Sequence, residues 1–153
     1  MNMGMSDHDR LEVAKTLANL LANTYVLYLK TQNFHWNVTG PMFQPLHIMF
    51  ESQYQALAEA VDQIAERIRA LGEYTPASLS QYLEMSLIEE AIDVPSAEGM
   101  VAQLLEDHET IVRAMRDTFE VIDDANDEVS ADLFVQRMTF HEKTAWMLRA
   151  TID

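Results

Sequence analysis

The chain has 153 residues, of which 48% are hydrophobic and 23% charged, a composition typical of a globular domain and not of a disordered chain. It contains no cysteine, which excludes disulfides and thiolate metal sites, and it has no apolar run long enough to span a membrane. Its 25 acidic and 10 basic residues give a formal net charge of −15, so we expect a cytoplasmic protein that repels nucleic acid and anionic membranes and attracts cations.

Two long antiparallel helices are predicted first, over residues 8–37 and 42–71. Apolar and aromatic side chains recur every three or four residues in each segment, and His35 and His47 fall within these two stripes. The turn at residues 39–41 (Thr-Gly-Pro) joins the helices, with its glycine expected to stop the first one. Periodicity alone therefore predicts that both histidines point inward near this turn.

The second half contains one short helix and two long ones. Thr75-Pro76 reads as an N-cap followed by proline at the first helical position, and Ser96 as the N-cap of the next helix. The predicted helices cover residues 77–92, 97–123 and 127–152, with a polar bend at 124–126. Four long helices with one long crossover are the ferritin-like arrangement. We predict a single all-α domain over residues 1–153, a ferritin-like four-helix bundle with a short extra helix between its second and third long helices.

A common ligand pattern of di-iron helix bundles is missing. Such bundles use Glu-x-x-His motifs, which place an acid and an imidazole one turn apart on the inner face. None of the five histidines has a glutamate three residues before it. We therefore expect no ordinary di-iron centre inside one bundle.

His35, His47, Asp62 and Glu66 are side chains that suit iron, because imidazole and carboxylate are both good ligands for it. From His47 to Asp62 the helix extends roughly 22 Å, at about 1.5 Å per residue. One chain cannot bring both sets to the same ion, so they are either unrelated or meet across a subunit boundary. The histidines are alternatively hydrogen-bonded core residues, and the acids alternatively a solvated helix face. If two copies of the second helix pack antiparallel about a two-fold axis, two identical shared sites result.

Three motifs resemble the signature of the Dps family, the miniferritins or DNA-binding proteins from starved cells. They are NFHWNVTG at residues 33–40, FQPLHIMFESQY at 43–54 and DQIAERIRALG at 62–72. The resemblance implies a hollow dodecamer with ferroxidase centres at its two-fold interfaces. His35 and His47 of one subunit and Asp62 and Glu66 of its neighbour would be both the catalytic residues and the ligands of a di-iron site.

The family resemblance also implies a function. Members bind Fe(II), oxidise it preferably with hydrogen peroxide and store ferric mineral, which gives protection from oxidative stress. Glu51 matches a position that assists the metal site in some members. Trp36 matches an aromatic residue near the site that could quench or relay an oxidising equivalent, although we expect core packing to be its main role. The best matches to the acids that line iron-admitting three-fold pores are Asp123, Glu128 and Asp132, whose alternative roles are helix capping and solvated charge.

The sequence departs from the family where DNA is concerned. Members that coat DNA usually carry a lysine-rich mobile tail, and this chain has none. We therefore expect no direct nucleic-acid binding. Two other functions remain: a nucleoid-associated protein that protects DNA structurally with little ferroxidase role, and a metal-free helical interaction module. His8, His108 and His141 have no partner that the sequence allows us to place.

Overall fold

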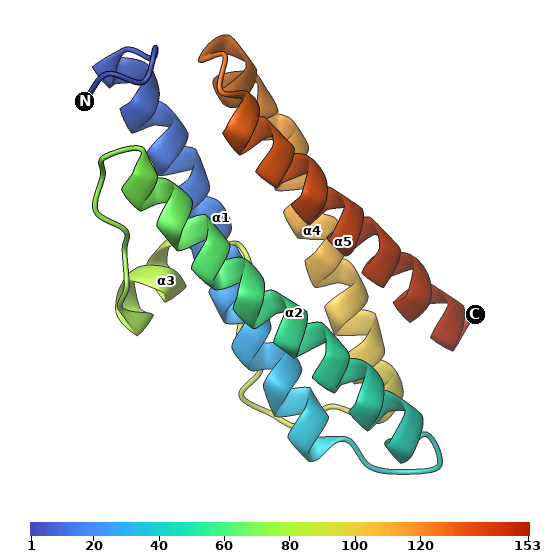
Figure 1. The fold of residues 1–153 in the computed structure, drawn as a ribbon. Coiled ribbons are helices and arrows are strands. Elements are labelled where there is room, and N and C mark those ends of the chain that lie inside the picture. Colours follow the sequence, from blue (N-terminus) through green and yellow to red (C-terminus); the bar gives the residue numbers. More distant parts are fainter.

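The structure is a computed structural model that describes residues 1–153, and it contains five helices and no strand. Two antiparallel hairpins form the body of the molecule, one of α1 and α2 and the other of α4 and α5, and α3 lies outside them beside α1 (Figure 1). The helices are α1 (Asp7–Asn37), α2 (Phe43–Ala70), α3 (Leu79–Met85), α4 (Ala97–Asp124) and α5 (Glu128–Ile152). This arrangement confirms the predicted ferritin-like bundle with a short helix in its crossover. No helix has both the length and the apolar character that a membrane span requires.

Turns at two helix ends are closed by residues with positive φ. After α2, Gly72 has φ +94°, its N–H bonds to the Arg69 carbonyl, and the next N–H bonds to the Ile68 carbonyl. After α4, Asn126 has φ 51°, its N–H bonds to the Asp123 carbonyl, and the next N–H bonds to the Ile122 carbonyl. Both are Schellman motifs, which satisfy carbonyls that a helix end leaves without partners. Glycine and asparagine stand at these positions because they adopt the left-handed conformation most easily.

The short helix is smaller than predicted, and Thr75 is not its N-cap. It covers seven residues, and Ser78 is the cap whose hydroxyl accepts the Gln81 N–H. The chain leaves α3 early because the buried Asn23 on α1 accepts a 2.7 Å hydrogen bond from the Leu87 N–H. A tertiary anchor of this kind outweighs the helical propensity of the following residues.

The core lies between the two hairpins and is made of buried aliphatic and aromatic side chains from all four long helices. The apolar stripe predicted for α2 is buried over most of its length, for example at Phe50 and Leu57. At the start of the helix, Phe43 is exposed and His47 is half-buried. His47 therefore stands at the edge of the core, where a ring nitrogen can be reached from outside.

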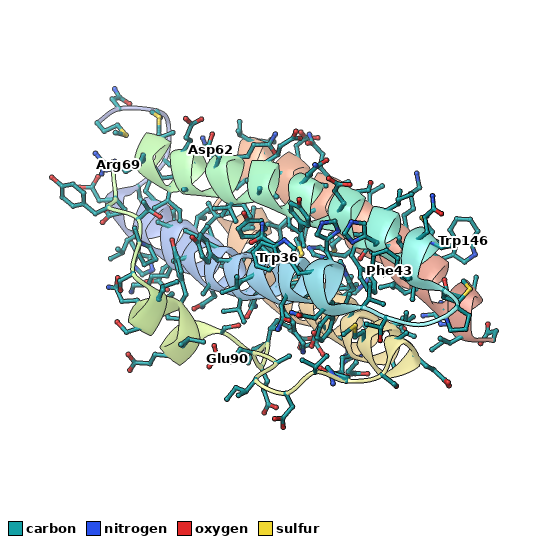
Figure 2. All side chains as sticks on the ribbon, turned by 90° about the horizontal axis from the view of Figure 1, so that it is seen from below. Trp36, Phe43, Asp62, Arg69, Glu90 and Trp146 are labelled. Carbon is teal, nitrogen blue, oxygen red and sulfur yellow. The ribbon has the colours of Figure 1, made fainter.

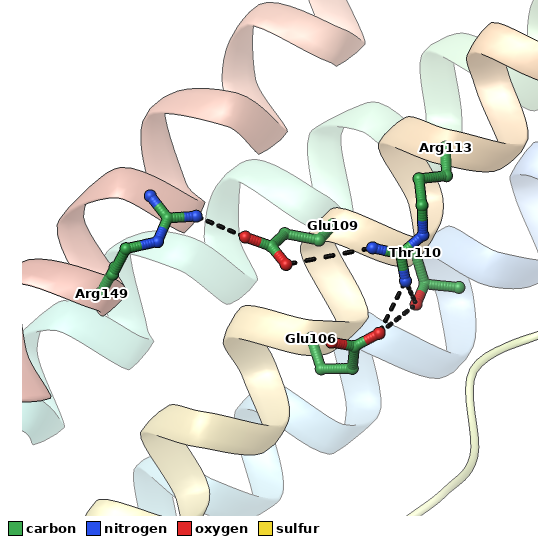
Figure 3. A network of polar contacts seen from close by, with 5 residues as sticks. All are labelled: Glu106, Glu109, Thr110, Arg113 and Arg149. Carbon is green, nitrogen blue, oxygen red and sulfur yellow. Dashed lines mark hydrogen bonds and ion pairs between the residues drawn. The ribbon is translucent and has the colours of Figure 1, made fainter.

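Polar side chains connect the hairpins as well. Arg67 on α2 donates two hydrogen bonds, of 2.8 and 2.9 Å, to the carboxylate of Asp127, which is also the N-cap of α5. Burial alone would raise the pKa of Asp127, but hydrogen bonds from Ser130 and from Arg67 hold it below its usual value. A second, exposed network joins α4 to α5 through ion pairs of Arg113 and Arg149 with glutamates of α4 (Figure 3). Exposed ion pairs of this kind contribute little stability.

Candidate metal site

His35 and His47 form a stacked pair at the closed end of the first hairpin. Their ring centroids are 3.8 Å apart and the ring planes differ by 14°. His35 lies in the last turn of α1 and His47 in the second turn of α2, each six residues from Pro41 in the connecting turn. Equal spacing from a hairpin turn places them opposite one another, as the sequence predicted.

The two rings are held by reciprocal hydrogen bonds to the backbone. The Nδ1 of His35 lies 2.7 Å from the carbonyl oxygen of His47, and the Nδ1 of His47 lies 2.7 Å from the carbonyl oxygen of His35. A carbonyl only accepts, so each Nδ1 must carry the proton and each Nε2 must keep its lone pair. Both Nε2 atoms remain accessible to solvent. The fold thus presents two oriented imidazole nitrogens in the protonation state that metal binding requires.

Aromatic rings enclose the pair on two sides. Phe43 stacks on His47 with centroids 5.0 Å apart, and the edge of Tyr54 meets His35 at 5.2 Å. Trp36 differs from its expected main role, because its side chain is 61% exposed and so it is not a core residue. It lines a groove of about 400 Å³ between α1 and the crossover segment, together with Tyr25 and Tyr82.

Asp62 and Glu66 lie far along α2 from the histidines, as the length of the helix requires. Figure 2 shows Asp62 toward one end of α2 and Phe43, which stacks on His47, toward the other. Both acids are exposed, and neither makes a hydrogen bond or an ion pair within the chain. No group of three or more potential ligands on this chain could hold a metal ion. A single chain therefore offers two half-sites: a nitrogen pair and a carboxylate pair.

The remaining predicted site residues lie outside these half-sites. Glu51, half-buried, stands one turn after His47 and has no partner in the chain. Asp123, Glu128 and Asp132 are exposed around the turn between α4 and α5, and Asp132 accepts a hydrogen bond from Gln136. These acids are free to face other molecules, unlike the neighbouring Asp127, which is buried in its bonds to Arg67.

A second histidine pair was not predicted. His108 on α4 and His141 on α5 are both fully buried, and their Nδ1 atoms are 2.7 Å apart. The two residues stand seventeen residues before and sixteen after Ala125, so symmetry about the second hairpin turn was the signal that could have paired them. Burial lowers the pKa of His108 to about 3, and Arg137 contributes to the shift. Both rings are therefore neutral, and they have no outlet to solvent.

Comparison with known proteins gives a consistent result. Residues 14–153 match the model of the ferritin family, described as a ferritin-like domain. A low temperature-induced protein from a Nostoc species is 43% identical over all of this chain and 87% of its own length. A protein named DNA protection during starvation protein 2, from Bacillus anthracis, is 40% identical over 93% of this chain and 97% of its own length.

Solved structures agree with these sequence matches. The crystal structure of a Dps protein from Bacillus brevis superposes with a TM-score of 0.93 at 37% identity, covering 97% of this chain and 100% of the other. The Vibrio cholerae Dps structure gives a TM-score of 0.94 at 32% identity over 100% of this chain and 97% of that one. The latter is described as a member of a broad superfamily of ferritin-like diiron-carboxylate proteins.

Proposed function

This chain belongs to the Dps family of ferritin-like proteins, and from this membership we propose that it is an iron-storing ferroxidase. In this proposal, copies of the chain assemble into a hollow shell of twelve subunits. Fe(II) is the substrate, hydrogen peroxide is the preferred oxidant, and ferric mineral is kept inside the shell. The result is protection from oxidative stress, because iron and peroxide are removed together.

The observation that carries the proposal is the division of the ligands into two half-sites. The reciprocal bonds of His35 and His47 leave two accessible Nε2 lone pairs, and no group of three or more potential ligands on the same chain surrounds them. The exposed pair of Asp62 and Glu66 has carboxylates with no partner. An isologous dimer with antiparallel α2 helices brings each half-site to the complementary half of its neighbour, and it forms two equal sites.

The ligand chemistry suits the oxidation of Fe(II). Imidazole nitrogens and carboxylate oxygens both bind Fe(II), and the carboxylates stabilise the more highly charged Fe(III). Two Fe(II) ions give one electron each to hydrogen peroxide, which takes up two protons and leaves as two water molecules. Because both electrons are supplied together, no hydroxyl radical is released. We propose Glu51, one turn after His47 on α2, as a further oxygen ligand on the histidine side, because it matches a position that assists the metal site in some members of the family.

Stopped-flow measurement of Fe(II) oxidation with peroxide tests the proposal. We expect the double variant His35→Ala/His47→Ala to lose the fast oxidation phase while it remains assembled. The matched control is His8→Ala, an exposed histidine outside both half-sites, which should keep the parent rate. Equal rates in the parent and the double variant contradict the proposed ferroxidase function.

Mixed assemblies test whether the site is shared. The histidine variant (His35→Ala/His47→Ala) and the acid variant (Asp62→Ala/Glu66→Ala) are each expected to be inactive. When they are co-expressed and pair at random, about half of the dimers contain one of each, and one of the two sites in such a dimer is intact. About one quarter of the parent activity should return in the mixture. If both half-sites served one chain only, no activity would return.

Asp123, Glu128 and Asp132 are proposed to line the pores through which iron reaches the interior. A ring of exposed carboxylates concentrates cations by focusing the electric field. Replacing all three by the corresponding amides should slow mineral growth at low iron concentration and leave single-turnover oxidation in opened shells unchanged.

Protection of DNA is proposed to be chemical, although relatives carry the name DNA protection during starvation protein. A net charge of −15 in each chain repels phosphates, and binding to DNA draws most of its affinity from lysine and arginine. We expect no retardation of DNA in a gel-shift assay at low magnesium concentration and physiological salt. A retarded band would favour the alternative, a nucleoid-associated structural protein.

A further inference from the structure

Arg137 on α5 is a buried cation that has no carboxylate partner in the chain. The residue is 8% exposed, and its Nε and Nη2 atoms are sealed from solvent and make no hydrogen bond. The other two buried lysine and arginine side chains each form an ion pair, Arg10 with Asp7 and Lys30 with Asp107. A chain with 25 acidic and 10 basic residues has no shortage of acids. The lack of a partner for Arg137 therefore points to a negative group from outside the chain.

The surroundings of the guanidinium stabilise its charge only in part. Burying an ion costs several kcal/mol unless a partner compensates for the lost water. Phe140 supplies some of this compensation, because the Cζ atom of Arg137 lies 4.6 Å from the centroid of its ring. A ring over the flat face of a guanidinium leaves the N–H groups, which point outward in its plane, without an acceptor. Burial lowers the pKa of Arg137 to about 10, so the group remains charged at neutral pH.

The two buried imidazoles belong to the same cluster. The ring of Phe140 lies 6.0 Å from that of His108 and 5.3 Å from that of His141, between centroids. Burial lowers the pKa of both imidazoles, and the charge of Arg137 lowers it further, which places the guanidinium close to both rings. Three side chains that are each at least nine-tenths buried, from α4 and α5, thus meet around Phe140.

This cluster has more hydrogen-bond donors than acceptors. The two Nδ1 atoms share one hydrogen bond, so one ring carries its proton on Nε2 and the other has a lone pair there. Neither Nε2 has a partner, and together with the Nε and Nη2 atoms of Arg137 they are four of the seven buried side-chain polar atoms that lack one. Three of these four nitrogens are donors. An excess of donors beside a positive charge suits an anion, whereas a guanidinium cannot bind a metal ion and a water molecule would leave the charge uncompensated.

We propose that Arg137, His108 and His141 form a binding site for one small inorganic anion, a halide such as chloride. The ion accepts hydrogen bonds from the Nε–H and Nη2–H groups of Arg137 and from the Nε2–H group of one imidazole. Because the three side chains are buried in a close-packed core, a single small ion suits the site better than a larger oxyanion. The Nη1 atom of Arg137 is not among the sealed atoms, so the ion can enter beside it.

The ion would join the two helices of the second hairpin and give the fold a dependence on halide. Its site is separate from the ferroxidase half-sites, which lie on α1 and α2, so the proposal stands or falls without the function proposed above.

Urea denaturation of the assembled protein at pH 7 tests this dependence. Sodium chloride is exchanged for sodium gluconate, whose anion is too large for the site, at constant ionic strength and protein concentration. A ligand that binds only the folded chain raises the ratio of folded to unfolded chain about tenfold for each tenfold increase in its concentration above the dissociation constant. We expect the unfolding midpoint of the parent to rise with chloride and with bromide.

Two variants show whether the effect belongs to this site. Arg137→Met should lose the rise with chloride, and it should fold, because an apolar side chain of similar volume often replaces a buried charge without loss of stability. Arg113→Met is the matched control, since Arg113 is an exposed arginine of α4, and it should keep the chloride dependence of the parent. An equal midpoint of the parent in chloride and gluconate, or a chloride effect that survives in Arg137→Met, overturns the proposal.

Crystals of the parent soaked in bromide give a direct observation that needs no variant. Anomalous diffraction at the bromine edge should show a peak beside the Nε and Nη2 atoms of Arg137. A water molecule there without anomalous signal, or a carboxylate of a neighbouring subunit on the guanidinium, contradicts the anion site. A bromide peak with no effect of chloride on the unfolding midpoint would mean binding at crystal concentration only, and this result also overturns the proposal.

Discussion

Lowering the pH from 7 to 5 should weaken the fold through the buried pair of His108 and His141. Their Nδ1 atoms share one hydrogen bond of 2.7 Å, which a proton on each ring would destroy. Neither Nε2 has a partner, and the buried guanidinium of Arg137 adds positive charge nearby. The folded protein therefore keeps both rings neutral at a pH where the unfolded chain binds a proton on each.

The size of the effect follows from the pKa values. The pKa of His108 is about 3 in the folded chain and near 6.5 in the unfolded one. Its contribution is complete above pH 6.5 and is lost as the pH falls toward 3, because only the unfolded state gains the proton. Between pH 7 and 5 this amounts to about 2 kcal/mol, at roughly 1.4 kcal/mol per pH unit. Burial also lowers the pKa of His141 well below its ordinary value, which adds a loss of the same sign.

One acidic group opposes this trend. Burial raises the pKa of Asp107 in spite of its ion pair with Lys30, so the folded state takes up that proton first and gains stability as the pH falls. A comparison of variants removes this contribution. The double variant His108→Leu/His141→Leu replaces both hydrogen-bonding partners by apolar groups of similar size and keeps Asp107.

Urea denaturation at pH 7, 6 and 5 is the assay. The free energy of unfolding of the parent should fall by about 2 kcal/mol or more relative to the double variant over this range. His8→Leu, at an exposed histidine, should follow the parent. Equal pH dependence in the parent and the double variant would refute the assignment of two neutral buried rings.

Two further predictions concern single side chains. Asp127→Ala leaves the half-buried guanidinium of Arg67 without its carboxylate partner, so the free energy of unfolding measured by urea denaturation should fall by about 3–5 kcal/mol. The control Asp124→Ala, at an exposed position, should change it little. Gly72→Ala forces a residue with a side chain into φ +94° and places its Cβ 3.0 Å from the Arg10 guanidinium. The free energy of unfolding should therefore fall by about 1–3 kcal/mol, measured by thermal unfolding. An unchanged melting temperature would contradict this strain.

The sequence predicts the long helices well because their signals are local. Ser96 and Gly72 cap helices where the pattern places them, and the observed bounds of α1 and α2 differ from the predicted ones by one residue. The short helix was predicted too long, because its end depends on Asn23, more than sixty residues away in the sequence. Long-range contacts of this kind leave no periodic pattern.

In the half-sites, too, local features can be predicted from the sequence and long-range contacts cannot. The inward register of His35 and His47 is a local property of two helices, and the sequence predicts it. Which nitrogen each ring leaves free depends on carbonyls of the opposite helix, and only the three-dimensional structure reveals it.

The two histidine pairs show why residue type and register do not decide function. Each pair is symmetric about a hairpin turn, and each ring makes one hydrogen bond through Nδ1. In the first pair the acceptors are carbonyls, so both rings carry their proton on Nδ1 and both Nε2 atoms are lone-pair donors at the surface. In the second pair the acceptor is the other ring, so one ring must carry its proton on Nε2, and both Nε2 atoms are sealed in the core. The acceptor and the burial, not the histidine, make one pair fit for metal binding and the other a structural contact that acid can open.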